Sequence, residues 1–289
     1  MFAVLAAARF AHFAAITLLF GLAAFPFYAT GPGEKAPRFD RLVKFCAVFA
    51  LLTGWLELAA MAANMGGSLA SAFDAQVFTA VVSDTAYGRV WLGRLLLAIL
   101  LLGMRVRPRP AKDRALLITS GLLLASVALT GHSAMPGGVP GVLHQLADAA
   151  HLLAAGWWIG GLAALVIVAR SLGDQATAVL ARFSGIGYGA VAAIAATGLF
   201  KSAILIATVS ASVSSAYGWV LLVKVGLFAG MGVLALSNHF WITPALARGD
   251  DRRLWLGRLQ AQVAVELALG IAILAVVGAL GAMQPPVAS

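Results

Sequence analysis

Charged residues are scarce in this 289-residue chain, since only 11% of it is Asp, Glu, Lys or Arg whereas 62% is hydrophobic. The mean hydropathy of +0.95 excludes a water-soluble globular fold of this length. The single cysteine, Cys46, excludes a disulfide within the chain and is expected to be a small buried apolar residue. The sequence also has no P-loop, dinucleotide-binding fingerprint, zinc-protease motif or nucleophile elbow. Nothing in it indicates covalent catalysis, and we do not expect an enzyme.

Hydrophobic stretches of about the twenty-residue length that crosses a bilayer recur along the whole chain. We therefore expect an all-α, polytopic membrane helix bundle with about eight transmembrane helices, forming a single transmembrane domain over residues 1–289. The predicted spans cover approximately residues 10–29, 42–64, 88–104, 115–131, 143–169, 182–207, 218–241 and 259–283. The first is interpreted as a retained span because Arg9 and His12 interrupt its apolar run and no basic segment precedes it.

Positive charge alternates between the connections of these predicted helices. Segments around 66–87, 132–142 and 208–217 contain no Lys or Arg, whereas the connections between them are basic. The positive-inside rule then predicts cytoplasmic basic connections and both termini outside. The net charge of +9 is thereby explained by membrane topology, and we expect no nucleic-acid partner.

A polar stripe is predicted within the fifth span. His144, Asp148 and His151 are spaced by four and then three residues, so they share one face of a helix. Ionisable groups in a bilayer cost several kcal/mol unless they face a partner, water or a ligand, so this stripe is a candidate site. Asp148 either orients an imidazole ligand or neutralises Lys201 or Lys224.

Methionines and further histidines suggest a soft metal ion. Met61 and Met65 follow Glu57 at helical spacing, and His132 and Met135 lie in a predicted outer loop. Thioether and imidazole ligands suit copper, above all Cu(I), although methionines also pack in ordinary apolar cores. The predicted metal ligands are His12, Met61, Met65, His132, Met135, His144 and His151, and the predicted charge-balancing neighbours are Glu57, Arg94, Asp148, Lys201 and Lys224.

Ionisable residues away from the basic connections are expected to gather in the outer half of the bundle. The inner half is expected to hold almost nothing ionisable apart from His239. We therefore predict an outward-facing polar vestibule above an apolar inner half.

Small residues at four-residue spacing predict close packing between helices. These are the pairs Gly156 and Gly160, Gly185 and Gly189, and Gly226 and Gly230. The segment 66–87 is predicted to include a short helix at the outer interface.

A set of motifs in the second half of the chain carries a family resemblance. The set comprises Gly131-His132-Ser133, His151, Trp158-Ile159-Gly160-Gly161, Arg182-Phe183-Ser184, Gly198, Tyr217-Gly218, Lys224, Asn238 and Pro244. In order and spacing it resembles the copper resistance protein D (CopD) family over about residues 85–245, although family members often have Asn-Arg where this chain has Asn238-His239. The resemblance implies a multi-pass protein of the bacterial inner membrane that moves copper from the periplasm toward the cytoplasm. It also implies a partner, a separate periplasmic copper-binding protein of the copper resistance protein C type.

The charge of the predicted vestibule leaves two alternatives to copper transport open. The predicted vestibule has more Arg and Lys than acidic residues, and excess positive charge repels a cation. A membrane haem protein would use this charge, because histidines from two helices can ligate the iron while Arg and Lys pair with the propionates. A transporter of anions or organic solutes also fits the charge sign, but it leaves the histidine stripe unexplained.

Overall fold

The computed structural model describes residues 1–31, 34, 36–104, 111–130, 138–168, 176–204, 215–248 and 251–283. Within these ranges every regular element is a helix, and there is no β-strand. The expected all-α fold is therefore confirmed.

The long helices are α1 (Phe2–Ala29), α2 (Asp40–Met65), α4 (Ala86–Gly103), α6 (Gly138–Val168), α7 (Ala176–Ile204), α9 (Ala216–Ser237) and α11 (Arg252–Ala282). The shorter elements are the 3-10 helix η1 (Leu69–Phe73), α3 (Ala75–Asp84), α5 (Ala111–Ala125), the 3-10 helix η3 (Ser126–Leu129), the π-helical turn η6 (Asn238–Ile242) and α10 (Thr243–Arg248). The segment 66–87 thus forms short helices, as expected.

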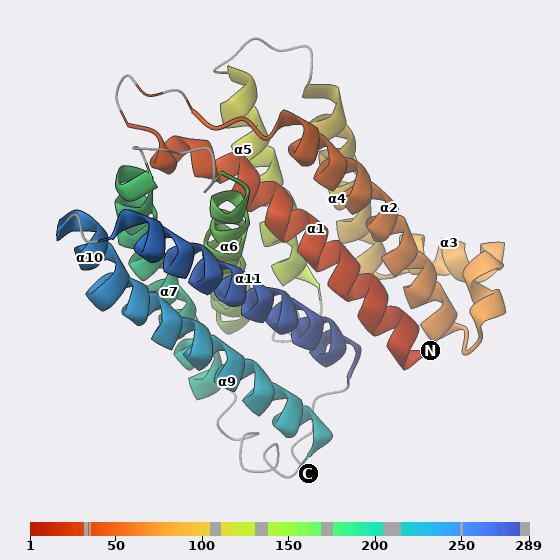
Figure 1. The fold of residues 1–289 in the computed structure, drawn as a ribbon. Coiled ribbons are helices and arrows are strands. Elements are labelled where there is room, and N and C mark those ends of the chain that lie inside the picture. Colours follow the sequence, from red (N-terminus) through yellow and green to blue (C-terminus); the bar gives the residue numbers. More distant parts are fainter. Residues whose placement is uncertain are drawn as a thin grey trace.

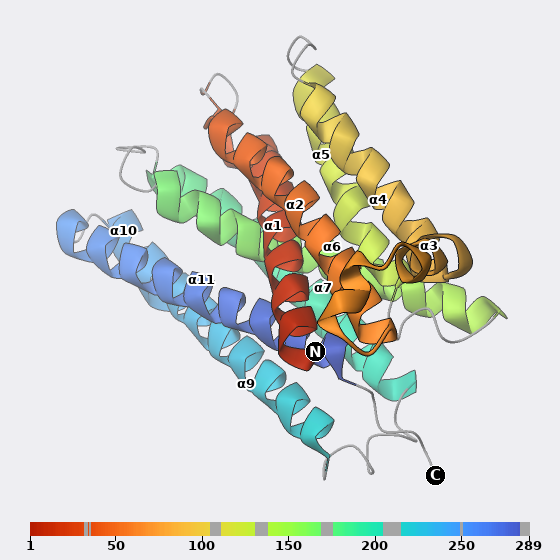
Figure 2. The same ribbon diagram turned by 90° about the vertical axis from the view of Figure 1, so that its right-hand side faces the viewer.

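Helices α1 and α6 lie in the middle of the bundle (Figures 1 and 2). On one side α1 packs against α2, which in turn packs against α4, with α5 behind them. On the other side α6 packs against α7, and α11 packs against both α1 and α9. The two flanks therefore meet along the central pair.

Glycines set the spacing of the central pair. A Cβ added to Gly21 of α1 would lie 2.3 Å from the Cα of Gly160 in α6, and one added to Gly156 would lie 2.5 Å from Leu124. This confirms that Gly156 and Gly160 permit close packing. For Gly185 and Gly189 the prediction is wrong, because a Cβ at either position would meet no described atom of another helix within 4 Å.

The third glycine pair is also not at a close contact. An added Cβ at Gly226 meets nothing within 4 Å, and one at Gly230 meets only Leu269, at 3.7 Å. The physical reason is that the glycine-bearing face of each of these helices does not point toward a closely packed neighbouring helix. The small-residue pattern allows close approach, but it does not determine whether another helix lies opposite.

The outer surfaces of the bundle are apolar, as a lipid-facing surface requires. Large side chains such as Leu96 of α4, Leu199 of α7 and Trp219 of α9 are exposed. In the part of the chain that the structure describes, seven helices are long and apolar enough to cross a membrane.

The remaining predicted span, 115–131, corresponds to α5 with η3. Helix α5 has only 15 residues before the backbone narrows to a 3-10 turn at Ser126. The Ser126 hydroxyl donates to the Leu123 carbonyl over 2.7 Å, and the Ser126 carbonyl accepts from Arg94 over 3.1 Å. At this helix end, side chains thus supply hydrogen-bond partners for backbone carbonyls, which in a continuing α-helix would accept from backbone amides of the next turn.

Candidate functional site

The sequence-predicted ligands do not converge on one point. His132 and Met135 lie outside the described residues. Met61 packs against a buried cluster that includes Leu58 and Trp91, and Met65 is exposed at the end of α2. The methionine pair is therefore part of an apolar cluster and an exposed helix end. The histidines lie elsewhere, in two clusters.

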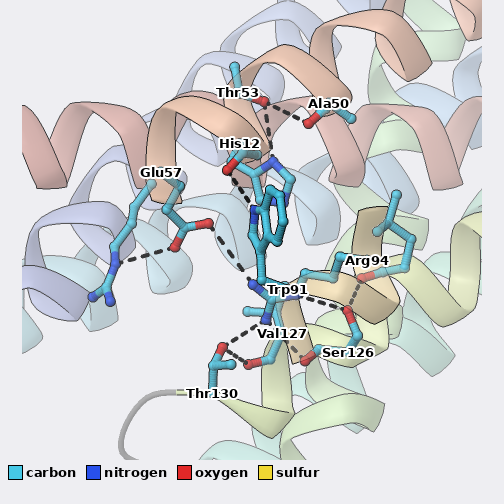
Figure 3. A network of polar contacts seen from close by, with 12 residues as sticks. His12, Ala50, Thr53, Glu57, Trp91, Arg94, Ser126, Val127 and Thr130 are labelled. Atoms are coloured by element: carbon cyan, nitrogen blue, oxygen red, sulfur yellow. Dashed lines mark hydrogen bonds and ion pairs between the residues drawn. The ribbon is translucent and has the colours of Figure 1, made fainter. Parts of the chain in front are cut away.

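The first cluster lies between α1 and α2 (Figure 3). His12 is 3% exposed, and its Nδ1 is 3.2 Å from the hydroxyl of Thr53. That hydroxyl donates its only hydrogen to backbone, with the Phe49 carbonyl at 2.7 Å and the Ala50 carbonyl at 3.2 Å. The Thr53 oxygen must therefore accept from His12 Nδ1–H, and in the neutral ring Nε2 carries the lone pair.

Beside His12 a buried carboxylate lies between two arginines (Figure 3). Glu57 is 3.5 Å from Arg9 Nε and 4.0 Å from an Nη of Arg94. Arg94 is held in place by Ser126 and by the Thr130 hydroxyl, which accepts from it over 2.7 Å. This cluster holds one acid and two bases, so it has a formal charge of +1 with neutral His12.

The second cluster lies between α6, α7 and α9. His151 Nδ1 is 2.9 Å from the Thr197 hydroxyl, which itself donates to the Ala193 carbonyl over 2.6 Å. His151 therefore has the same hydrogen-bond arrangement as His12, with Nδ1–H engaged and Nε2 bearing the lone pair. Metal-binding imidazoles are commonly fixed in this way.

The charged residues of the second cluster also repeat the first. Asp148 forms an ion pair with Lys201, and Lys224 of α9 interacts electrostatically with both. One acid and two bases again give a formal charge of +1. The ion pair with Lys201 matches one of the two roles expected for Asp148, neutralisation of a lysine.

The two clusters share a register as well as a composition. Arg9 and Asp148 each lie three residues before the histidine of their cluster, and Glu57 and Lys201 each lie four residues after its threonine. In each cluster an ion pair joins these two positions. The base precedes the histidine in the first cluster, whereas the acid precedes it in the second. The bundle therefore contains two similar His–Thr sites, one on each side of the α1–α6 contact.

His144 is the third histidine of interest, and it differs from the other two. It lies on the same face of α6 as Asp148 and His151 and is 5% exposed. Neither of its ring nitrogens has a hydrogen-bond partner among the described residues. A buried imidazole without a partner is unusual, because desolvation of its polar atoms is then uncompensated.

The half of the bundle toward the basic connections contains a carboxylate that the sequence reasoning missed. Glu266 of α11 is 2% exposed and accepts a hydrogen bond of 2.6 Å from Asn238 Nδ2. The expectation that this half holds almost nothing ionisable apart from His239 is thus wrong. An isolated acid within an apolar span was the available signal.

Within the described residues, no group of three or more His, Cys, Asp or Glu side chains is arranged to hold a metal ion. Each histidine cluster instead supplies one oriented imidazole and a carboxylate already paired with a base. Chemically, each cluster offers a metal ion one imidazole nitrogen, next to a carboxylate that is already paired with a base.

Two family models match the chain. Residues 1–142 match the model described as copper resistance protein D-like, N-terminal domain, and residues 177–280 match copper resistance protein D. The chain is 30% identical to the inner membrane protein YebZ of Escherichia coli (strain K12), covering 96% of this chain and 97% of the relative. It is also 30% identical to the copper resistance protein D of Pseudomonas syringae pv. tomato, covering 96% of each.

A third relative is longer. The copper transport protein CutJ of Bacillus subtilis (strain 168) is 32% identical over 97% of this chain and 53% of its own length. No solved structure matches the chain.

Proposed function

This chain belongs to the copper resistance protein D family, and on that premise we propose that it moves copper across the bacterial inner membrane, from the periplasm toward the cytoplasm. It is a multi-pass membrane protein whose relatives include an inner membrane protein and a copper transport protein. The family names indicate copper resistance and transport, and we assign the chain no catalytic reaction.

The observation that carries the proposal is the buried, unpartnered imidazole of His144. It lies on α6 six residues after Gly138, where the described part of that helix begins. In the proposed pathway a soft cation supplies the partner that the His144 ring lacks. Copper reaches it from His132 and Met135, delivered by a periplasmic protein of the copper resistance protein C type.

His151 is the next ligand in this pathway. Its Nδ1–H is engaged by Thr197, so Nε2 faces the ion as the neutral ligand atom. Copper bound to His151 competes with Lys201 for the carboxylate of Asp148, since one carboxylate cannot fully neutralise both cations. Movement of Lys201 away from Asp148 is therefore part of the proposed binding step.

Copper retention by purified protein tests the proposal. The wild type and His144→Ala are incubated with Cu(I) under reducing conditions, passed over a desalting column and analysed for copper and protein. We expect stoichiometric copper on the wild type and its loss from His144→Ala. His239→Ala is the matched control, because His239 is an exposed histidine in η6. Full copper retention by His144→Ala would contradict the proposed site.

Haem binding is the second candidate, and the formal charge of +1 in each histidine cluster is the observation that favours it. Arginines and lysines could pair with haem propionates there. An optical spectrum of the same samples separates the two functions. Iron with a Soret band and no copper would assign the histidines to haem, whereas copper without a Soret band supports transport.

A further inference from the structure

Glu266 lies in the apolar middle of α11, and none of the described bases compensates its charge. It is 2% exposed, and no described Lys, Arg or His forms an ion pair with it. Its hydrogen-bond partner is the neutral amide of Asn238, whose Nδ2 donates to Oε1 over 2.6 Å. An ionised carboxylate held by one neutral donor is costly in such surroundings, whereas a protonated carboxyl is not.

Asn238 supplies independent evidence for a proton at this site. The side chain is 7% exposed, and its Oδ1 has no hydrogen-bond partner among the described residues. Protonation of Glu266 creates an O–H donor, which is the group that Oδ1 lacks. The carboxyl and the amide can then exchange two hydrogen bonds, one in each direction.

The backbone is irregular at the same position. The π-helical turn η6 begins at Asn238, and Gln262 of α11 donates to the Leu234 carbonyl over 3.1 Å. π-Helical turns are frequent at functional sites because they shift the register of the helix that follows. Asn238, the first residue of this turn, is joined to Glu266 by its side-chain hydrogen bond, so the turn and the carboxyl are in direct contact.

Few titratable or charged groups lie on the described elements packed against Glu266. Helix α7 contributes Tyr188, which packs edge-on against His239, with ring centroids 5.0 Å apart. His239 is exposed. On α11 itself the nearest described base toward the start of the helix is Arg258, eight residues or about 12 Å away, and it lies over Trp255. The other contacting helices, α1, α6 and α10, have no described ion pair with Glu266.

An apolar layer separates this carboxyl from His151. Ile159 of α6 faces Gly270 of α11, with an added Cβ at Gly270 falling 3.1 Å from Ile159. Beside Ile159, Trp158 packs edge-on against Phe228. Ile159 lies eight residues beyond His151, about 12 Å along α6, and Glu266 lies one turn further toward the basic connections.

We propose that Glu266 and Asn238 form a proton-binding site, on the opposite side of the apolar layer from His151, that couples copper movement to proton movement. The inference rests on the proposed copper transport. When Glu266 takes up a proton, the carboxyl pairs with both amide atoms of Asn238 and holds η6 in place. When it loses the proton, Asn238 Oδ1 and the carboxylate repel each other, and η6 is no longer held against α11.

Infrared spectroscopy tests the proton site without copper. The purified protein is titrated with alkali, and the C=O stretch of protonated carboxyls is compared between the wild type and Glu266→Gln, which preserves the shape of the neutral acid. We expect a band at neutral pH that disappears at alkaline pH in the wild type and is missing from Glu266→Gln. Asp84→Asn, which removes an exposed carboxyl, should retain the band. Identical wild-type and Glu266→Gln spectra at every pH would overturn the proposal.

A second variant tests the same pairing in case Glu266→Gln does not fold. Asn238→Ala keeps the carboxyl but removes its amide partner, so the band should shift in frequency and titrate at a different pH. An unchanged band would also contradict the proposed pairing.

Copper uptake into proteoliposomes then tests the coupling. A pH gradient should change the uptake rate of the wild type about tenfold, while Glu266→Gln binds Cu(I) normally but no longer responds to the gradient. If Glu266→Gln keeps the response, the coupling is wrong although transport stands. If the wild type moves no copper but its carboxyl titrates as expected, the transport proposal fails and the proton site stands.

Discussion

Gly21 and Gly160 meet backbone to backbone at the crossing of α1 and α6, where a Cβ on Gly160 would lie 2.4 Å from the Gly21 Cα. His12 and His151 each lie nine residues before the glycine of their own helix, or about 13.5 Å along it. The two His–Thr sites therefore flank the α1–α6 contact, and each lies the same distance from it along its own helix, toward the N-terminus of that helix. Any change that separates α1 from α6 should alter both sites together.

Gly160→Ala tests this contact. The added methyl group has no room against the Gly21 backbone, so we expect a loss of about 1–3 kcal/mol in unfolding free energy. The measurement is thermal unfolding in detergent. Gly189→Ala is the control, because a Cβ there meets nothing within 4 Å. Equal stability of the two variants would show that the close approach is unimportant.

Glu57→Gln should destabilise the first cluster strongly. The change leaves Arg9 and Arg94 buried together without a negative charge, and breaking a buried ion pair typically costs about 3–5 kcal/mol. Asp40→Asn is the matched control, since it breaks a more exposed pair with Lys112 at 3.3 Å. That pair should contribute at most about 1 kcal/mol. Chemical unfolding followed by tryptophan fluorescence compares the variants.

Lys201→Met should strengthen copper binding. The change releases Asp148 from its ion pair and removes a positive charge from the His151 site, so we expect about tenfold tighter Cu(I) retention. Lys112→Met, remote from this cluster, should leave copper affinity unchanged. Weaker binding of the ion by Lys201→Met would instead indicate that the lysine holds an anionic ligand.

Stability should fall at acidic pH because of Glu34. Its carboxylate accepts from Arg182 over 2.7 Å and from the Gly31 amide over 2.7 Å, and the Arg182 bond in particular lowers the pKa of Glu34 below its usual 4.5. The stabilisation is therefore fully present above about pH 4.5 and is lost as pH falls through the lower, folded-state pKa. Melting temperatures measured between pH 7 and about pH 3 should show this loss in the wild type and a smaller one in Glu34→Gln.

Several features of this protein follow from the sequence alone. Long apolar runs predict membrane helices because backbone polar groups must be paired within a bilayer, and the length of each run predicts roughly where each helix lies. The spacing of His144, Asp148 and His151 predicts one shared face because helical periodicity is local. Motif order identified the family, which the matches to the copper resistance protein D models confirm.

Which residues of different helices meet could not be predicted from the sequence and is seen only in the tertiary structure. The same glycine spacing occurs at Gly160 and Gly189, yet only the former has a helix pressed against it, since the facing partner is remote in sequence. Likewise Asp148 could have paired with Lys201 or with a ligand, and the packing of α7 against α6 brings the lysine to it. The sequence reasoning missed Glu266, and the tertiary structure places Asn238 of η6 beside it. Local periodicity determines which residues share a face, whereas only packing determines what that face meets.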